Sequence, residues 1–108
     1  MTVGSTIMER KRFILKLLND NKETLQSIGI KSIGIFGSVV RGEDTEDSDY
    51  DILVEFEKGH RKFKSFSKLC DFLETYVGEK YDLITKDGLS PHIGKTILKE
   101  VQYVDIHS

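Results

Sequence analysis

The sequence predicts an α/β (α+β) fold in which a small mixed sheet of three or four strands is flanked by helices. Segments whose apolar residues recur at helical spacing alternate with short runs rich in β-branched and aromatic residues. Glycines and the single proline stand at several junctions between these segments, where helices end or begin. A chain of 108 residues suffices for one modest core, so a single domain over residues 1–108 is expected.

The first third of the chain predicts a helical segment followed by a strand. Apolar residues recur with basic residues between them from about Ile7 to Ile28, which is typical of an amphipathic helix. A break is expected near Asn19–Asn21, and Gly29 is expected to cap the helix in the left-handed conformation. Lys31–Phe36 is predicted as a short buried strand, in which Gly34 indicates close approach of another backbone.

The middle of the chain predicts a strand, a helix and a further strand. Asp49–Phe56 has an apolar centre and is predicted as the second strand, followed by an exposed charged loop at Glu57–Lys62. Apolar residues at helical spacing then predict a helix over Phe63–Val77, closed by Gly78. The sequence YDLIT at Tyr81–Thr85 predicts the third strand.

The C-terminal segment predicts a turn, a helix and an edge strand. Lys86–Gly88 is predicted as a turn that leads to Ser90-Pro91, a favourable helix start with proline at the first helical position. This helix is expected to run to about Lys99, and Val101–Ile106 is predicted as the last strand.

Composition and charge limit the class of protein. The formal net charge of −2 gives no reason to expect a nucleic-acid partner, and the basic residues from Lys58 to Lys68 are more simply a solvated helix face. No run approaches the roughly 18 apolar residues of a membrane-spanning helix. The first 30 residues lack a signal-peptide pattern, and Cys70 is the only cysteine. A cytoplasmic protein is therefore expected.

Residues 37–51, GSVVRGEDTEDSDYD, concentrate six carboxylates between Glu43 and Asp51. Asp49 and Asp51 alternate along the predicted strand and project to one side, with Cα atoms roughly 6–7 Å apart. Carboxylates held so close repel one another unless a cation binds between them, and oxygen-only ligands suit a pair of Mg²⁺ ions. Alternatively, Asp49-Tyr50-Asp51 is only the polar start of a strand.

Two further features accompany this pair of carboxylates. Gly37-Ser38 follows a strand directly, and backbone N–H groups at a strand-to-helix turn, with the Ser38 hydroxyl, can bind a phosphate. An ordinary turn with an N-cap is the alternative. Asp82 places a third carboxylate within a short apolar strand, which is costly unless it faces a cation or, alternatively, water at a sheet edge.

These motifs resemble a known superfamily. The GS at 37–38, ten intervening residues and the DYD at 49–51 resemble the G-S-x10-D-x-D signature of the DNA polymerase β-like nucleotidyltransferases. The order of the predicted elements also resembles that catalytic core over most of the chain. In addition, the RGE at 41–43 and the SD at 48–49 resemble the small stand-alone members called minimal nucleotidyltransferases, or MNT proteins.

The resemblance implies a Mg²⁺-dependent transfer of AMP from ATP to a hydroxyl, by in-line attack on the α-phosphorus with release of pyrophosphate. It implies that Gly37 and Ser38 contact the triphosphate and that Asp49 and Asp51 hold two Mg²⁺ ions. Asp82 would hold the ion nearer the nucleophile and help to deprotonate the attacking hydroxyl.

Arg41 and the remaining acidic residues are assigned less specific roles. Arg41 is a candidate for binding a nucleotide phosphate, or alternatively for an ion pair with Asp47 or Asp49. A solvated loop is expected for the remaining acidic residues of the stretch, Glu43, Asp44, Glu46 and Asp47.

The resemblance also implies a partner. MNT proteins are commonly paired with a helical HEPN ribonuclease toxin, so the chain is expected to be an antitoxin that transfers AMP to a tyrosine of such a toxin. The chain ends about 26 residues after Asp82, so the acceptor is expected on another subunit of a homo- or hetero-oligomer. The alternative is a non-catalytic module that neutralises the toxin by contact alone. The sequence leaves the base preference of the nucleotide open.

Overall fold

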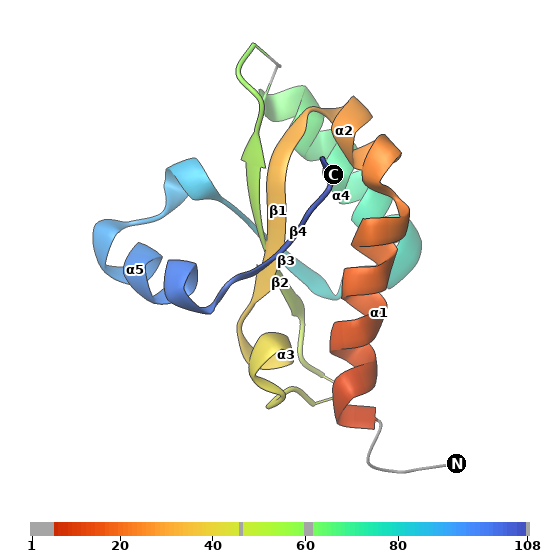
Figure 1. Cartoon of the computed structure of the whole chain (residues 1–108), viewed down its shortest axis with the longest axis vertical. Helices are drawn as coiled ribbons and strands as arrows, with labels where there is room; N and C mark the ends of the chain where they lie inside the picture. Colours follow the sequence, from red (N-terminus) through yellow and green to blue (C-terminus); the bar gives the residue numbers. More distant parts are fainter. Residues whose placement is uncertain (1–5, 46, 60–61, 108) are drawn as a thin grey trace.

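A computed structural model describes residues 6–45, 47–59 and 62–107 of the chain. Helices and strands alternate along it, as the sequence predicts (Figure 1). In chain order the elements are α1 (Thr6–Asp20), α2 (Lys22–Ile28), β1 (Ile30–Phe36), α3 (Ser38–Arg41), β2 (Tyr50–Phe56), α4 (Lys62–Val77), β3 (Tyr81–Thr85), the 3₁₀ helix η2 (Lys86–Gly88), α5 (Pro91–Glu100) and β4 (Gln102–Val104).

The four strands form one mixed sheet in the order β3-β2-β1-β4. β1 pairs antiparallel with both β2 and β4, whereas β2 and β3 are parallel. A parallel pair needs a crossover connection, which α4 supplies between β2 and β3. The sheet confirms the predicted fold class.

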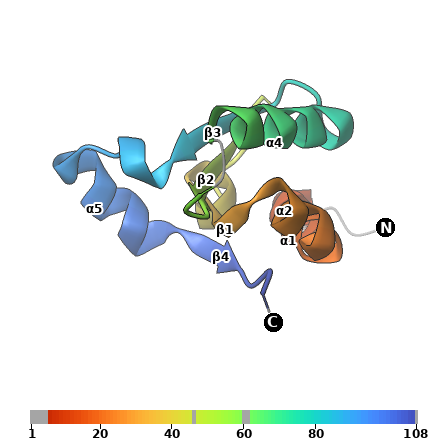
Figure 2. The same ribbon diagram turned by 90° about the horizontal axis from the view of Figure 1, so that it is seen from above.

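One face of the sheet carries the main core, covered by α1, α2 and α4 (Figure 2). Side chains alternate along each strand, so every second residue of β1 and β2 faces these helices. Burial of these apolar side chains is the main stabilising contribution to the fold. The fully buried members are Ile14, Leu18, Leu25, Ile30, Ile33, Ile35, Val39, Ile52, Val54, Leu69, Leu73 and Ile106.

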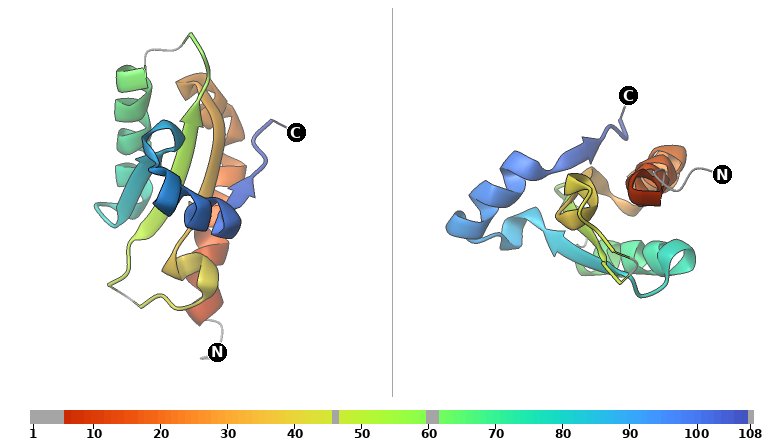
Figure 3. Two further views of the ribbon diagram at one scale, coloured as in Figure 1. Left: turned by 90° about the vertical axis from the view of Figure 1, so that its left-hand side faces the viewer. Right: turned by 90° about the horizontal axis from the view of Figure 1, so that it is seen from below.

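On the opposite face of the sheet, α5 packs over part of the strands (Figure 3). Here Phe36 and Leu53 pack against Ile97 of α5 in a second, smaller cluster. Asp51 precedes Leu53 by two residues on β2 and therefore projects to this same face. The smaller apolar layer thus leaves room for polar side chains where β1 ends and β2 begins.

Local predictions for the first helical segment and strand are confirmed. The segment breaks after Asp20, and the Asn21 side-chain amide donates a 2.8 Å hydrogen bond to the carbonyl of Leu17. Gly29 caps α2 with φ +99°. A Cβ atom on Gly34 would lie only 2.9 Å from the carbonyl oxygen of Gln102, so the predicted close backbone approach is that of β4.

Several boundaries differ slightly from the prediction. β2 begins at Tyr50, one residue later than predicted, and α4 begins at Lys62, within the predicted loop. Residues 60 and 61 of that loop lie outside the described residues. The last strand covers only Gln102–Val104, because only these residues pair with β1. Among the described residues, no helix combines the length and the apolar character needed to cross a membrane.

Candidate active site

The turn between β1 and α3 is built around Gly37. Its backbone has φ +79° and ψ −155°, a conformation that is accessible almost only to glycine. A Cβ atom at this position would lie 2.1 Å from Oδ2 of Asp51, inside van der Waals contact. The carboxylate of Asp51 therefore lies directly against the turn, and no side chain fits between them.

Asp51 lies at the centre of the predicted site because of its position in the sheet. It pairs with Phe36 of β1 on one side and with Asp82 of β3 on the other. Residues in register on neighbouring strands lie about 5 Å apart and project to the same face, so Asp51 and Asp82 are neighbours. Parallel pairing of β2 with β3 thus brings together two carboxylates that are distant in sequence.

The surroundings of Asp51 disfavour its charged form. Burial raises the pKa of Asp51, and the negative charges of Asp82 and Asp49 raise it further. Glu100 contributes repulsion in the same direction, whereas Arg41 partly opposes it. Asp51 is half-buried, and a bound cation would offset the repulsion that its carboxylate experiences from the neighbouring negative charges.

Asp49 and Asp82 are both more open to solvent than Asp51. Asp49 is exposed and lies just before β2, and Asp82 is exposed on the edge strand β3. Within the ranges that the structure describes, no three His, Cys, Asp or Glu side chains are close enough together to form a metal-binding cluster. The three aspartates are thus close enough for their charges to repel one another, but their side chains do not converge on one metal position.

The chemistry of these residues fits a hard divalent cation. Every candidate donor is a carboxylate oxygen, the ligand type that Mg²⁺ prefers. The repulsion felt by Asp51 is the electrostatic condition that a cation would reverse. Asp51, with Asp49 and Asp82 beside it, is therefore a suitable position for such an ion.

The repulsion at Asp51 predicts a gain in stability when its charge is removed. Because its pKa is raised on folding, ionised Asp51 destabilises the fold at neutral pH, and this penalty disappears as the pH falls through the folded-state pKa. In excess chelator at pH 7, Asp51→Asn should raise the Tm by about 1–4 °C, since 1 kcal/mol corresponds to roughly 4–8 °C and Asp51 is only half-buried.

Thermal unfolding followed by circular dichroism measures this effect, with Asp47→Asn, an exposed carboxylate of the same stretch, as the matched control. The advantage of Asp51→Asn over the wild type should shrink as the pH is lowered. A clear drop in Tm at pH 7 would instead show that the Asp51 carboxylate supports the fold.

Arg41 pairs with glutamates and not with Asp47 or Asp49, which corrects the alternative expected from the sequence. Its Nε lies 2.7 Å from Oε1 of Glu43, and its Nη1 lies 2.5 Å from Oε1 of Glu100. Glu43 lies only two residues beyond Arg41, after the Gly42 cap of α3, and Glu100 lies at the end of α5 beside the Gly37 turn.

Glu100 is a further residue of the site, and no pattern in the sequence indicates it. Its Oε2 accepts a 2.8 Å hydrogen bond from the backbone N–H of Gly37. The hydrogen bond from Arg41 lowers the pKa of Glu100, and the Gly37 N–H acts in the same direction. Two of the donors predicted to bind phosphate, the Gly37 N–H and the Arg41 guanidinium, are thus occupied by a carboxylate of the chain itself.

The position of Glu100 follows from the register of β4. Ile35 pairs with Gln102 across the antiparallel β1–β4 pair, so continuing this register places Glu100 opposite Gly37. A strand of three residues carries too little pattern to reveal its register from the sequence.

The expectation that Asp44 is solvated is wrong. Its side chain is only 2% exposed and pairs with Arg10 of α1 at 3.1 Å. Arg10 supplies the compensating charge from a helix far away in sequence, so the local run of acidic residues gave no signal of it. Asp47 is exposed and the Glu43 side chain is 64% exposed, as expected, and Glu46 lies outside the described residues.

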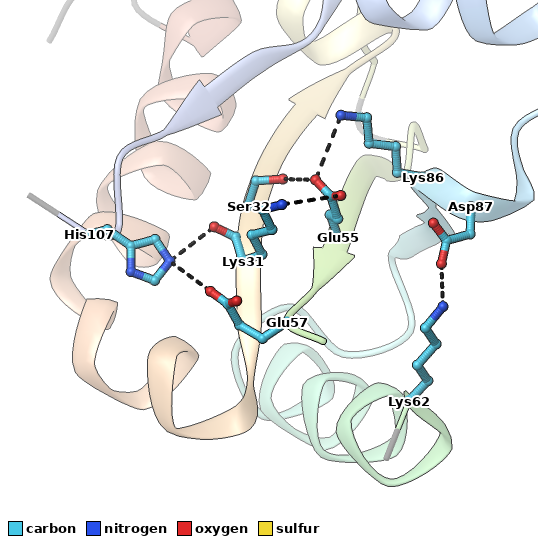
Figure 4. Close-up of polar contacts among 8 residues, drawn as sticks. All are labelled: Lys31, Ser32, Glu55, Glu57, Lys62, Lys86, Asp87 and His107. Carbon is cyan, nitrogen blue, oxygen red and sulfur yellow. Dashed lines mark hydrogen bonds and ion pairs between the residues drawn. The ribbon is translucent and has the colours of Figure 1, made fainter. Parts of the chain in front are cut away.

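A second group of charged residues lies at the opposite end of the sheet (Figure 4). Glu55 lies 3.6 Å from Lys86 and 3.9 Å from Lys31, and Lys62 pairs with Asp87. A cavity of about 290 Å³ adjoins them, lined by Phe56, Phe63 and Phe66 among other residues. None of the predicted site residues lines this cavity, and its opposite charges are paired.

The glycine turn against Asp51, with Asp82 beside it on a parallel strand, fits the nucleotidyltransferase core that the sequence resembles. The nucleotidyltransferase domain family matches residues 14–104, and the chain belongs to this family. It is a minimal nucleotidyltransferase of the polymerase β-like superfamily, which confirms the resemblance seen in the sequence.

Comparison with individual proteins supports the same family assignment. The chain is 48% identical over 83 residues to protein adenylyltransferase MntA of Thermococcus cleftensis, covering 77% of this chain and 83% of the relative. A solved structure described as a minimal nucleotidyltransferase superimposes with a TM-score of 0.64 at 35% identity, covering 82% of this chain and 93% of that one. A toxin–antitoxin structure with AMP-PNP shares the fold, with a TM-score of 0.58 at 22% identity over 83% of this chain and 68% of that one.

Proposed function

We propose that this nucleotidyltransferase transfers AMP from ATP to a hydroxyl, that of a tyrosine, on a helical HEPN-type toxin and thereby acts as a cytoplasmic antitoxin. The observation that carries the proposal is the position of Asp51, against the Gly37 turn on one side and beside Asp82 on the other. The name of the Thermococcus relative supports a protein acceptor, and the toxin–antitoxin structure with AMP-PNP supports both the partner and the nucleotide.

Each site residue has a role in this proposal. Gly37 and Ser38 donate hydrogen bonds to triphosphate oxygens, and Asp49 and Asp51 hold two Mg²⁺ ions. Mg²⁺, when bound, supplies positive charge that offsets the charge of the triphosphate and of the developing transition state. Asp82 would hold the ion nearer the attacking hydroxyl and accept its proton. The hydroxyl oxygen forms the new bond to the α-phosphorus as the bond from that phosphorus to pyrophosphate breaks.

Nucleotide binding at this turn involves Glu100. Gly37 and Arg41 already donate to its carboxylate, and one N–H hydrogen cannot serve two acceptors at full strength. A phosphate oxygen that accepts from the Gly37 N–H therefore takes the place of Glu100. Arg41 is the candidate to follow the phosphate, because its guanidinium has five donors.

Titration calorimetry tests the nucleotide site. We expect the chain to bind ATP in the presence of Mg²⁺ and to lose most of this affinity in excess chelator, because the aspartates repel a triphosphate without the cations. Asp51→Asn should weaken the Mg²⁺-dependent binding, whereas Asp47→Asn, which removes an exposed carboxylate nearby, should leave it unchanged. Equal affinity with Mg²⁺ and with chelator would contradict the proposed site.

A further inference from the structure

One side chain of α1, that of Arg10, binds the segment between α3 and β2, residues 42–49. Arg10 donates to three acceptors in this segment: Oδ2 of Asp44 at 3.1 Å, the carbonyl of Thr45 at 2.6 Å and the carbonyl of Ser48. A planar guanidinium with five donors can satisfy several acceptors at once, which an ammonium cannot do with the same geometry. Arg10 thus ties the start of the segment to its end.

Arg10 is itself anchored to the sheet. Its guanidinium carbon lies 4.7 Å from the centre of the Tyr50 ring, within the range of a cation–π contact. Tyr50 is buried at 8% exposure, and its N–H donates to the carbonyl of Lys80 at 3.0 Å. The ring of Phe13, one turn further along α1, lies 6.4 Å from that of Tyr50. These contacts of Arg10, here called the Arg10 clamp, therefore join α1, the segment and Tyr50, the first residue of β2.

The acceptor at Ser48 links this clamp to the site. The Ser48 carbonyl belongs to the peptide group that joins Ser48 to Asp49, so the hydrogen bond from Arg10 fixes the backbone on which Asp49 is placed. Thr45 and Ser48 also bond to each other, through the Thr45 N–H to Ser48 Oγ and the Ser48 N–H to the Thr45 carbonyl. Arg10 therefore binds two residues, Thr45 and Ser48, that are also bonded to each other directly before Asp49.

The burial of Asp44 shows that the segment depends on Arg10. The Asp44 side chain is 2% exposed, and its Oδ1 has no hydrogen-bond partner among the described residues. A buried carboxylate is strongly destabilising without its charged partner. The segment is therefore stable in this position only while Arg10 is present.

We propose that Arg10 is a positioning residue for nucleotidyl transfer. Through its hydrogen bond to the Ser48 carbonyl, Arg10 sets the position of Asp49 beside Asp51. The inference rests on the proposed function, in which Asp49 binds Mg²⁺. Arg10 does not touch the reacting atoms, and its effect passes through the backbone of the segment.

Arg10→Lys keeps the charge but loses the planar set of donors. We expect AMP transfer by this variant to fall about 10- to 100-fold in kcat, since small displacements of a metal ligand have effects of this size, with less than about a threefold change in KM for ATP. The Mg²⁺ concentration that gives half-maximal rate should rise, and high Mg²⁺ should restore part of the rate. Arg12→Lys, an exposed arginine of the same helix, is the matched control and should behave as wild type.

A paired variant separates positioning from stability. Arg10→Met leaves the Asp44 carboxylate without a partner and should lower the Tm, and adding Asp44→Asn should recover most of this loss by removing the buried charge. The double variant still lacks the donor to the Ser48 carbonyl, so its transfer rate should stay low. In the double variant, measured in chelator, hydrogen exchange of the backbone amides at 47–49 should be faster than in the wild type, while the exchange rates of the β1 amides should be unchanged.

The outcomes are distinguishable. A double variant with wild-type Tm and wild-type kcat, or an Arg10→Lys variant with unchanged kcat and Mg²⁺ dependence, would show that Arg10 only supports the fold and would overturn the inference. A wild-type chain with no Mg²⁺-dependent nucleotide binding would overturn the proposed function and the inference with it.

Discussion

Asp51→Asn is expected to lower the rate of AMP transfer by at least about 10²–10³-fold, the largest effect of any single carboxylate in the chain. Asp51 is the one aspartate placed between the Gly37 turn and Asp82, and an amide removes the negative charge that binds a cation. The apolar contacts of β2 are untouched, because asparagine has nearly the same shape. Transfer of labelled AMP from ATP to the proposed toxin partner, once purified, measures the rate, with Asp47→Asn as the control.

The same position separates catalysis from contact as the mechanism of neutralisation. A chain with Asp49 and Asp51 both changed to Asn should fold and bind the partner but fail to protect cells that express it. If that double variant protects cells as well as the wild type does, the chain neutralises its partner by contact, and adenylylation is not the antitoxin mechanism.

Gly37→Ala is the second substitution with a large expected effect, because it combines two independent costs. The conformation at φ +79° and ψ −155° costs roughly 1–3 kcal/mol for a residue with a Cβ atom, which corresponds to a fall in Tm of at least about 4 °C. The added methyl group would also lie 2.1 Å from Oδ2 of Asp51, so the carboxylate must move. We expect transfer activity to fall by about 10²-fold or more.

Gly78→Ala is the matched control for this experiment. Gly78 also has a positive φ, +64°, but no atom lies within 4 Å of the position that a Cβ atom would occupy. This variant should lose stability through backbone strain and keep its transfer activity below its Tm. If Gly37→Ala retained the activity of Gly78→Ala, displacement of Asp51 would have no role in the reaction.

The sequence predicted those parts of the molecule that depend on local pattern. The bounds of β3, the left-handed cap at Gly29 and the N-cap at Ser90 follow from neighbouring residues, and the structure confirms them. The Gly37 turn and Asp51 were predicted as site residues from a motif that is nearly continuous along the chain, and the structure places them in contact. Asp82 was predicted through its charge within an apolar strand; the structure exposes it on the edge strand β3, and the parallel register places it beside Asp51.

The contacts that escaped prediction depend on how distant segments pack. Glu100 reaches Gly37 through the register of a three-residue strand, and Arg10 reaches Asp44 by the docking of α1 against the segment before β2. On the helix pattern alone, Arg10 is one of several basic residues between apolar ones. A buried ion pair between distant residues leaves each partner looking like an ordinary surface charge.

The crossover between β2 and β3 has a consequence for how the protein gains its activity during synthesis. Asp82 can meet Asp51 only after α4 has reversed the chain direction and β3 has paired alongside β2. Because the ribosome makes the chain from its N-terminus, a nascent chain that has displayed the glycine turn and Asp51 still lacks the third aspartate. Glu100 arrives later still, with the pairing of β4 onto β1. Under the proposed assignment, a chain made only as far as β2 therefore lacks part of the site, which is assembled only after β3 and β4 have paired.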